Sequence, residues 1–169
     1  LYGYVADGYW TAVGNLQEYL RASGDILERK VSVEPLGTEL LPGVWCEDDV
    51  DISPDAHLEG PIFLGSGVRV REEAHILGPA VVRDNTIVDA RAHIERSVIW
   101  GNSYIGEAAD VRGSIVCQQC SIKSQAVIFE GAVVGDNTAI GQQAVIHPNV
   151  KIWPGKEIEP GAIVKTSII

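Results

Sequence analysis

Three histidines of this sequence, His57, His75 and His93, lie at a constant spacing of eighteen residues. Imidazole nitrogens bind transition metals and anionic groups, so a repeated histidine raises the question of a metal or phosphate site. Each histidine stands directly before an apolar residue, and we expect the three side chains to point outward on one face, in a ladder with rungs about 5 Å apart. A straight ladder does not surround a metal ion. The spacing therefore favours a surface or domain-packing role.

The three cysteines, Cys46, Cys117 and Cys120, are the other reactive side chains of interest. An odd number argues against a disulfide framework. Cys117 and Cys120 form a C-x-x-C pair, but a structural zinc site needs four ligands and no second pair exists. In the repeat described below Cys120 points inward and Cys117 outward, so the two thiols face opposite ways. We expect no metal and no cofactor in this chain.

The net charge of −10 lies mostly in the front of the chain. Residues 1–60 carry 12 acidic and 3 basic side chains, whereas residues 61–169 carry 11 and 10. This balance leaves no basic surface for nucleic acid. No apolar run approaches the roughly twenty residues of a membrane span, and the first residues lack the features of a signal peptide. We expect a soluble, cytoplasmic protein that binds neither nucleic acid nor membrane.

An apolar residue returns at nearly every sixth position from Ile52 to Val164. These positions are Ile52, Leu58, Leu64, Val70, Ile76, Val82, Val88, Ile94, Ile99, Ile105, Val111, Val116, Ile122, Ile128, Val134, Ile140, Ile146, Ile152, Ile158 and Val164. A small or apolar residue, such as Ala74 or Ala126, usually stands two positions earlier. In many hexads a turn-former stands three positions later. These turn-formers are Gly67, Asn85, Asn102, Gly131, Asn137, Asn149, Gly155 and Gly161.

Two inward residues separated by one outward residue form a short strand, because successive side chains of a strand point to opposite faces. Gly or Asn with positive φ then allows a sharp corner. Three strands and three corners form a triangular coil of eighteen residues, and twenty hexads form between six and seven coils. The pattern therefore predicts an all-β fold: a left-handed parallel β-helix of hexapeptide repeats over residues 44–169. One-residue slips after Ile94 and after Val111 predict shortened corners rather than loops.

Outward positions also repeat at the spacing of one coil. The residues of the predicted interface are Val127, Phe129, Val145, His147 and Ile163. An aligned set of apolar side chains on the outside indicates a surface for a partner. Phe63 and Val81 repeat this arrangement more weakly on another face. We expect the partner to be a second copy of the chain, in a homo-oligomer, or other domains of the same polypeptide.

The residues before the repeat follow a different pattern. Residues 1–5 read as a strand, and Asn15 begins a helix because Glu18, three residues later, completes a capping box. Gly24 is expected to end this helix. Residues 25–43, with two prolines and two glycines, read as a connector. One strand and one helix cannot form a core alone, so they must pack on the β-helix or on another part of the polypeptide.

Residues 8–15, with the sequence Gly-Tyr-Trp-Thr-Ala-Val-Gly-Asn, and residues 19–22, Tyr-Leu-Arg-Ala, carry a resemblance. They resemble the closing segment of the catalytic domain of sugar-1-phosphate nucleotidyltransferases, and mannose-1-phosphate guanylyltransferases and glucose-1-phosphate nucleotidyltransferases above all. In that family a Trp-x-Asp-x-Gly stretch ends the catalytic domain, a short helix follows, and a hexapeptide β-helix often comes next. The resemblance implies that residues 1–24 are the tail of such a domain. Its motif remnants are Gly8, Tyr9, Trp10 and Gly14.

The family forms an NDP-sugar and pyrophosphate from an NTP and a sugar-1-phosphate, and the resemblance favours the GDP-mannose type. The family's magnesium-holding Asp corresponds to Ala12 here, and the Gly-rich phosphate-binding signature is absent. The resemblance therefore assigns Mg²⁺, nucleotide and sugar-1-phosphate to the complete protein only. This chain holds no catalytic residue, and we expect its β-helix to serve assembly or regulation.

Two alternatives stay open at this stage. The chain could be a purely structural assembly module, or a hexapeptide-repeat acyltransferase that uses outward-pointing His147 as a general base. Acyltransferases of this kind usually insert a long loop into the repeats, and none exists between Ile52 and Val164. The chain also begins without Met and keeps the hexad pattern through residues 164–169. Because uncovered strand edges invite pairing with other chains, we expect further polypeptide on both sides.

Overall fold

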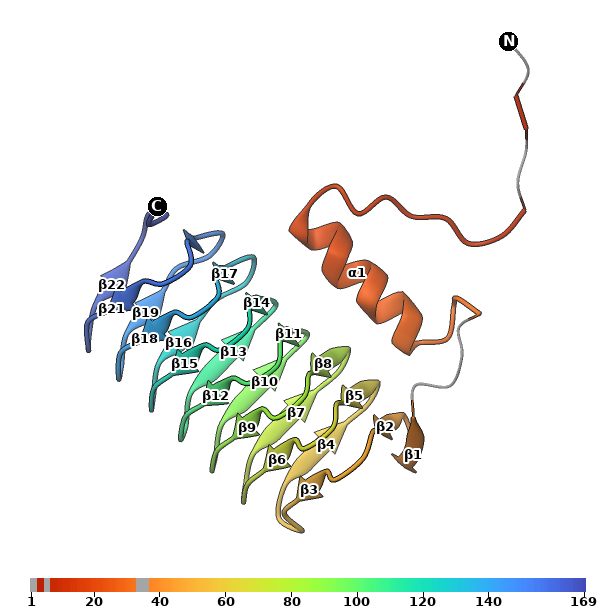
Figure 1. The fold of residues 1–169 in the computed structure, drawn as a ribbon, viewed down its shortest axis with the longest axis horizontal. Coiled ribbons are helices and arrows are strands. Elements are labelled where there is room, and N and C mark those ends of the chain that lie inside the picture. The colour runs from red at the N-terminus through yellow and green to blue at the C-terminus, as the bar shows by residue number, and fades with distance from the viewer. Residues whose placement is uncertain (1–2, 5–6, 33–36) are drawn as a thin grey trace.

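The computed structural model describes residues 3–4, 7–32 and 37–169. Within these residues the chain forms one helix, α1(Leu16–Leu27), and a series of short strands that wind into a prism of stacked coils (Figure 1). Apart from β1, the strands pair in parallel with the strand one coil away. The predicted all-β fold, a left-handed parallel β-helix of hexapeptide repeats, is confirmed.

The three sides of the prism are three sheets, which we call sheets A, B and C. In spatial order sheet A contains β1(Thr38–Leu41), β2(Val44–Cys46), β5(Ile62–Leu64), β8(Ala80–Val82), β11(Val98–Ile99), β14(Ile115–Val116), β17(Val133–Val134) and β20(Lys151–Ile152). Sheet B contains β3(Asp51–Ile52), β6(Arg69–Val70), β9(Ile87–Val88), β12(Tyr104–Ile105), β15(Ser121–Ile122), β18(Ala139–Ile140) and β21(Glu157–Ile158). Sheet C contains β4(His57–Glu59), β7(His75–Leu77), β10(His93–Glu95), β13(Asp110–Arg112), β16(Val127–Ile128), β19(Val145–Ile146) and β22(Ile163–Val164).

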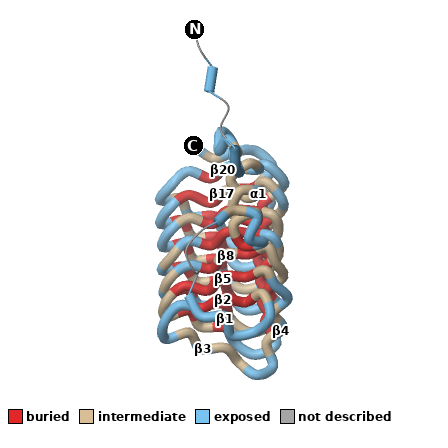
Figure 2. The backbone as a smooth tube through the Cα atoms, turned by 90° about the vertical axis from the view of Figure 1, so that its right-hand side faces the viewer, coloured by how far each residue is buried: buried red, intermediate tan, exposed pale blue. Residues whose placement is uncertain are grey.

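The predicted inward residues form the core of the prism. Ile122 pairs with Ile140, and Ile140 pairs with Ile158, so that identical side chains stack from coil to coil. Small residues such as Ala126 are fully buried beside them. Figure 2 shows the buried residues gathered along the inside of the coils. Cys120 points inward, as the repeat predicted, with its Sγ 3.1 Å from the carbonyl oxygen of Gly135. Cys117, predicted to point outward, is half-buried.

The corners follow the prediction and extend it. All eight predicted Gly and Asn turn-formers have positive φ. Other corners hold Glu73, Arg91 and Ala108 at φ near 55°, which composition alone did not reveal. Arg96 and Gly113 turn the chain at the two slips, and the next strand begins two residues after each. The slips are therefore shortened corners rather than loops.

Helix α1 begins as predicted but ends later. The Asn15 side chain accepts a hydrogen bond from the backbone N–H of Glu18 at 2.9 Å, and the Glu18 carboxylate accepts one from the N–H of Gly14. The prediction that Gly24 ends the helix is wrong, because α1 continues to Leu27. Gly24 lies buried against Pro79, where an added Cβ would stand 3.1 Å from the proline Cγ. Its lack of a side chain serves close packing rather than termination.

The segment predicted as a connector, residues 25–43, holds the last turn of α1 and strand β1. Strand β1 pairs antiparallel with β2 and extends sheet A beyond the first coil. The strand predicted at residues 1–5 falls mostly on residues outside the described part of the chain. Among the described residues, no helix has the length and apolar character that a membrane crossing requires.

Candidate assembly surfaces

Helix α1 covers the outward face of sheet A. Leu27 packs on Trp45 and Phe63, and these three side chains are buried, with Val81 beside them. Phe63 and Val81 were predicted to be a weak partner surface, and the partner is the chain's own helix. Of the two arrangements expected for the residues before the repeat, packing on the β-helix therefore holds for α1.

Sequence reasoning missed two residues of this covered face. Val98 and Ile115 point outward on sheet A and are also buried. Val98 lies one coil beyond Val81, and Ile115 lies one coil beyond Val98. Each of these steps is seventeen residues rather than eighteen, because each contains a shortened corner. The signal was present in the sequence, and correcting the spacing for the two slips would have found it.

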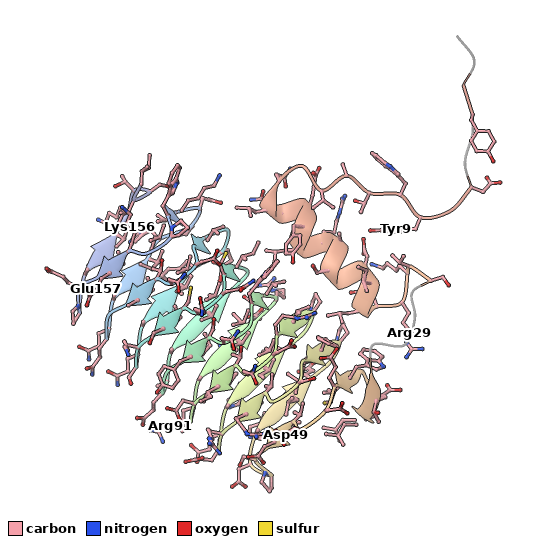
Figure 3. The ribbon with its side chains drawn as sticks, viewed as in Figure 1. Tyr9, Arg29, Asp49, Arg91, Lys156 and Glu157 are labelled. Atoms are coloured by element: carbon pink, nitrogen blue, oxygen red, sulfur yellow. The ribbon has the colours of Figure 1, made fainter. Side chains whose placement is uncertain are left out.

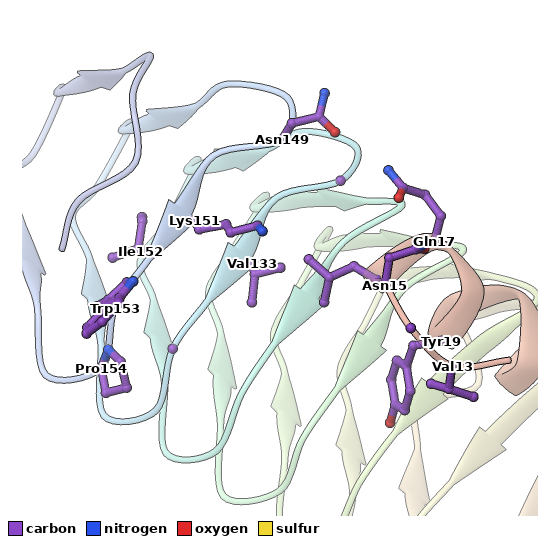
Figure 4. A pocket seen from close by; sticks show the side chains of 14 residues that line it. Val13, Asn15, Gln17, Tyr19, Val133, Asn149, Lys151, Ile152, Trp153 and Pro154 are labelled. Carbon is purple, nitrogen blue, oxygen red and sulfur yellow. The ribbon is translucent and has the colours of Figure 1, made fainter.

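A groove of about 880 Å³ lies where the N-terminal end of α1 leaves sheet A uncovered (Figure 4). Val133 lies on its floor, Lys151 reaches in from β20, and Trp153 and Pro154 form one rim. Asn15 and other residues at the start of the helix form the opposite wall. None of the described residues that line the groove is a carboxylate, a histidine or a cysteine. The groove therefore lacks the side chains that most often act in acid–base catalysis.

We call the outward surface of the seven strands of sheet C the sheet C face. The predicted histidine ladder forms one end of it, on β4, β7 and β10. The rings of His57 and His75 stack with centroids 4.7 Å apart, and His75 meets His93 edge to face at 6.4 Å. Among the described residues, no three His, Cys, Asp or Glu side chains gather in a way that could hold a metal ion.

A charged network lies on β13, the middle strand of sheet C. Arg112 donates to both carboxylate oxygens of Asp110, through Nε at 2.8 Å and through a terminal nitrogen. The hydrogen bond from Arg112 to Asp110 raises the pKa of the guanidinium above its ordinary value. His93 Nδ1 lies 3.2 Å from the same carboxylate, on the neighbouring strand. His93 was a sequence-based candidate, but Asp110 and Arg112 were not, although they lie two residues apart in one strand.

The predicted interface residues occupy the other end of the sheet C face. Val127, Val145 and Ile163 align on β16, β19 and β22. Val127 and Val145 are half-buried, and Ile163 is 63% exposed. The rings of Phe129 and His147 meet edge to face with centroids 6.5 Å apart. The structure brings all five residues together in one patch.

The segment that carries the motif remnants lies along α1 (Figure 3). The Tyr9 hydroxyl donates to the Asp25 carboxylate at 2.5 Å, and this bond raises the pKa of Tyr9. Arg21 donates to the Thr11 hydroxyl at 3.0 Å. Trp10, in contrast, is 84% exposed. The segment is thus attached to the helix while its largest aromatic side chain remains free.

Ala12 is exposed in this segment and offers no oxygen atom on its side chain. Magnesium prefers carboxylate and water oxygens. The residues of this segment therefore do not fit a magnesium site of the kind that the resemblance implies for the complete protein.

Comparison with known proteins gives one family and a set of similar folds. A family model described as the EIF2B subunit epsilon LbH domain matches residues 42–146. No curated protein sequence matches the chain. Similar solved structures include a proposed acetyltransferase from Bacillus cereus, with 23% identity and a TM-score of 0.58, over 69% of this chain and 73% of that one.

Two further solved structures are acyltransferases. The UDP-N-acetylglucosamine acyltransferase from Campylobacter jejuni has 17% identity and a TM-score of 0.51, over 76% of this chain and 68% of that one. A mutant of the N-acyltransferase AntD from Bacillus cereus, in complex with dTDP and coenzyme A, has 18% identity and a TM-score of 0.50, over 73% and 74%. At these low identities the similarity shows the fold alone.

Proposed function

This chain belongs to the EIF2B subunit epsilon LbH domain family, and we propose that it is the non-catalytic assembly module of a nucleotidyltransferase. In this proposal the complete protein joins an NTP to a sugar-1-phosphate, with GDP-mannose as the favoured product. The β-helix holds the catalytic domain in a fixed orientation and brings subunits together.

One observation carries this proposal: the segment with the motif remnants is attached to a helix that is itself docked on the coils. Tyr9 bonds to Asp25 of α1, and Leu27 of α1 packs on Phe63 of sheet A. A domain that continues from this segment would be attached to α1 through the exposed Tyr9–Asp25 hydrogen bond, and α1 is held on the β-helix through the buried contacts of Leu27. Trp10 and Val13, both exposed, offer that domain an apolar contact.

The chain's own residues favour binding and assembly over catalysis. Ala12 replaces the carboxylate that the resembled family uses for magnesium. The groove beside α1 has no carboxylate, histidine or cysteine among the described residues that line it. NTP, sugar-1-phosphate and Mg²⁺ are therefore assigned to the complete protein.

The test compares the complete endogenous polypeptide with residues 1–169 alone. Pyrophosphate release from GTP and mannose-1-phosphate is measured with Mg²⁺ present, and other NTP and sugar-1-phosphate pairs follow. We expect release by the complete polypeptide and none by residues 1–169. A complete polypeptide that releases pyrophosphate from no pair would contradict the proposal, and so would release by residues 1–169.

Assembly is tested separately with Val145→Lys/Ile163→Lys. Two lysines in the apolar end of the sheet C face should shift the protein toward a smaller species in sedimentation velocity, because charge is costly to desolvate at an interface. A matched control, Ser121→Lys/Ala139→Lys, places two lysines on neighbouring strands of sheet B. An unchanged sedimentation coefficient for the double variant would contradict an assembly role for this face.

An acyltransferase function is the alternative, since several proteins of similar fold carry that name. His147 is half-buried on the sheet C face and could act as a base. Against this, strands β3 to β22 follow one another through short corners, with no inserted loop to cover an acyl donor. Acetyl transfer from acetyl-CoA to an amine by residues 1–169, lost in His147→Ala, would favour the alternative.

A further inference from the structure

The pattern of the sheet C face identifies a partner. We propose that this face packs against the same face of a second copy of the chain, about a two-fold axis parallel to the stack of coils. The inference rests on the proposed assembly function and adds the partner and its geometry. In a two-fold interface the same patch serves both subunits, so the patch must be complementary to itself.

Each coil presents two outward residues on the sheet C face, one on either side of an inward residue. In β4, β7, β10 and β13 both belong to the strand, whereas after β16, β19 and β22 the second is the residue that follows the strand. A two-fold axis parallel to the stack places each strand antiparallel over the same strand of the second copy. The first outward residue of a strand then faces the second outward residue of its counterpart. Self-complementarity is therefore decided strand by strand, from the two side chains that each strand presents.

The charged strands satisfy this condition. On β13, Asp110 would face Arg112 of the second copy, and Arg112 would face its Asp110. The two acidic and two basic groups would alternate around the axis, in addition to the pair that each chain already forms. On β10, the imidazole of His93 would face the Glu95 carboxylate, with which it can form a hydrogen bond. Opposite charges placed across an interface select the partner and its register.

The apolar strands satisfy the same condition. Val127 of β16 would face Phe129, the residue directly after β16, of the second copy, so that apolar side chains meet on both sides of the axis. Val145 and His147 would pair in the same way one coil further on. At the end of the stack Ile163, with 63% of its surface exposed, would face exposed Lys165 of the second copy, whose methylene groups can cover it while the ammonium group stays in water. The face therefore combines an apolar end with a charged centre, and both match themselves in this one orientation.

The other simple two-fold arrangement fails on charge. An axis parallel to the strands inverts the stack, and β13, the middle of the seven strands, then faces itself in the same direction. Asp110 would oppose Asp110, and Arg112 would oppose Arg112. Like charges placed opposite one another destabilise such contacts. The charges on β13 thus select the axis parallel to the stack.

The size of the face sets the strength of the contact. Seven strands about 4.8 Å apart span roughly 30 Å, and three residues along a strand span about 10 Å. The projected area is about 300 Å² per copy, compared with about 800 Å² per partner in a standard interface. The isolated chain should therefore associate weakly, and the measurement must extend to high protein concentration.

The test uses residues 1–169, which form the β-helix described above, in sedimentation equilibrium over a wide concentration range. Asp110→Arg leaves β13 with two positive side chains, and Arg112→Asp leaves it with two negative ones. Each variant alone should repel its own copy and associate about tenfold more weakly than the parent chain. An equimolar mixture of the two variants should recover association, because positive then faces negative throughout.

The mixture separates this geometry from a simple loss of folding. Both single variants lose the pair between Asp110 and Arg112 within the chain, and mixing cannot restore a pair within a chain. Recovery in the mixture therefore requires contact between copies at β13. Glu157→Lys on sheet B is the control for charge alone and should associate as the parent does. Circular dichroism confirms that each variant keeps its strands.

Three results would overturn the inference. The first is a parent chain that stays monomeric at every concentration. The proposed function would not fail with it, because the pyrophosphate assay on the complete polypeptide tests that function independently. Association that neither β13 variant weakens would place the contact on another face. Association that the variants weaken and the mixture does not recover would exclude the two-fold geometry.

Discussion

Docking of α1 on sheet A depends on the absence of a side chain at Gly24. A Cβ at this position would stand 3.1 Å from Pro79 Cγ and 3.3 Å from its Cβ. Replacing glycine by alanine inside a helix gains about 1 kcal/mol of helix propensity. The tight contact opposes this gain, and we expect Gly24→Ala to be close to neutral. Gly24→Val adds two further methyl groups to the Cβ that alanine would introduce, and overpacking of this kind costs roughly 1 to 3 kcal/mol.

The expected effect of Gly24→Val is that α1 lifts from sheet A while the coils stay folded. The core of the β-helix contains no residue of α1, so its cooperative unfolding should change little. Trp45 reports the docking, because it is buried beneath Leu27 with the Arg29 guanidinium 5.1 Å from its ring centroid. Its fluorescence should shift to longer wavelength when the helix leaves.

The measurement needs Trp45 as the only tryptophan, with Trp10, Trp100 and Trp153 replaced by phenylalanine. Gln17→Val is the control, because Gln17 is exposed on the same helix and valine there causes no clash. Valine lowers the helix propensity at Gln17 and raises it at Gly24, so a helix that lifts only in Gly24→Val must do so because of the clash. An emission maximum unchanged in Gly24→Val, together with unchanged amide protection of α1, would show that close packing on Pro79 does not hold the helix.

Two further predictions concern the interior of the prism. Ile140→Asp would bury an unpaired carboxylate between Ile122 and Ile158, at a position with no exposed surface. It should lower the free energy of unfolding by several kcal/mol and the melting temperature by about ten degrees. An unchanged unfolding transition would mean that the inward register is wrong. Burial raises the pKa of the Cys120 thiol from 9.0 to about 11. The buried thiol therefore makes its full contribution to the free energy of unfolding below pH 9, and this contribution is lost as the pH rises through about 11. The loss should approach roughly 2 to 3 kcal/mol, and Cys120→Ala should remove this alkaline slope in chemical denaturation, whereas an identical slope in both proteins would refute the assignment.

The hexad pattern was sufficient to predict the β-helix and its register. The hexad pattern demands alternation of inward and outward residues, and each corner needs a residue that tolerates positive φ, as Asn85 and Gly131 do. Neighbouring coils then align because an apolar residue must stack on an apolar residue to keep the interior apolar, as Ile122 does on Ile140 and Ile94 on Val111. These are local and periodic requirements, so a single chain displays them without reference to its fold. The N-terminal cap at Asn15 was predictable for the same reason.

Tertiary structure decided which outward ladders are covered. Phe63 and Val127 look alike in sequence, since both are apolar outward residues that repeat once per coil, but α1 buries only Phe63. The role of Gly24 was also decided there, because a glycine that ends a helix and a glycine that lets a helix approach Pro79 have the same sequence context. The physical reason is that a side chain's outward direction is set by its own strand, whereas its burial depends on which distant segment of the chain lies over it.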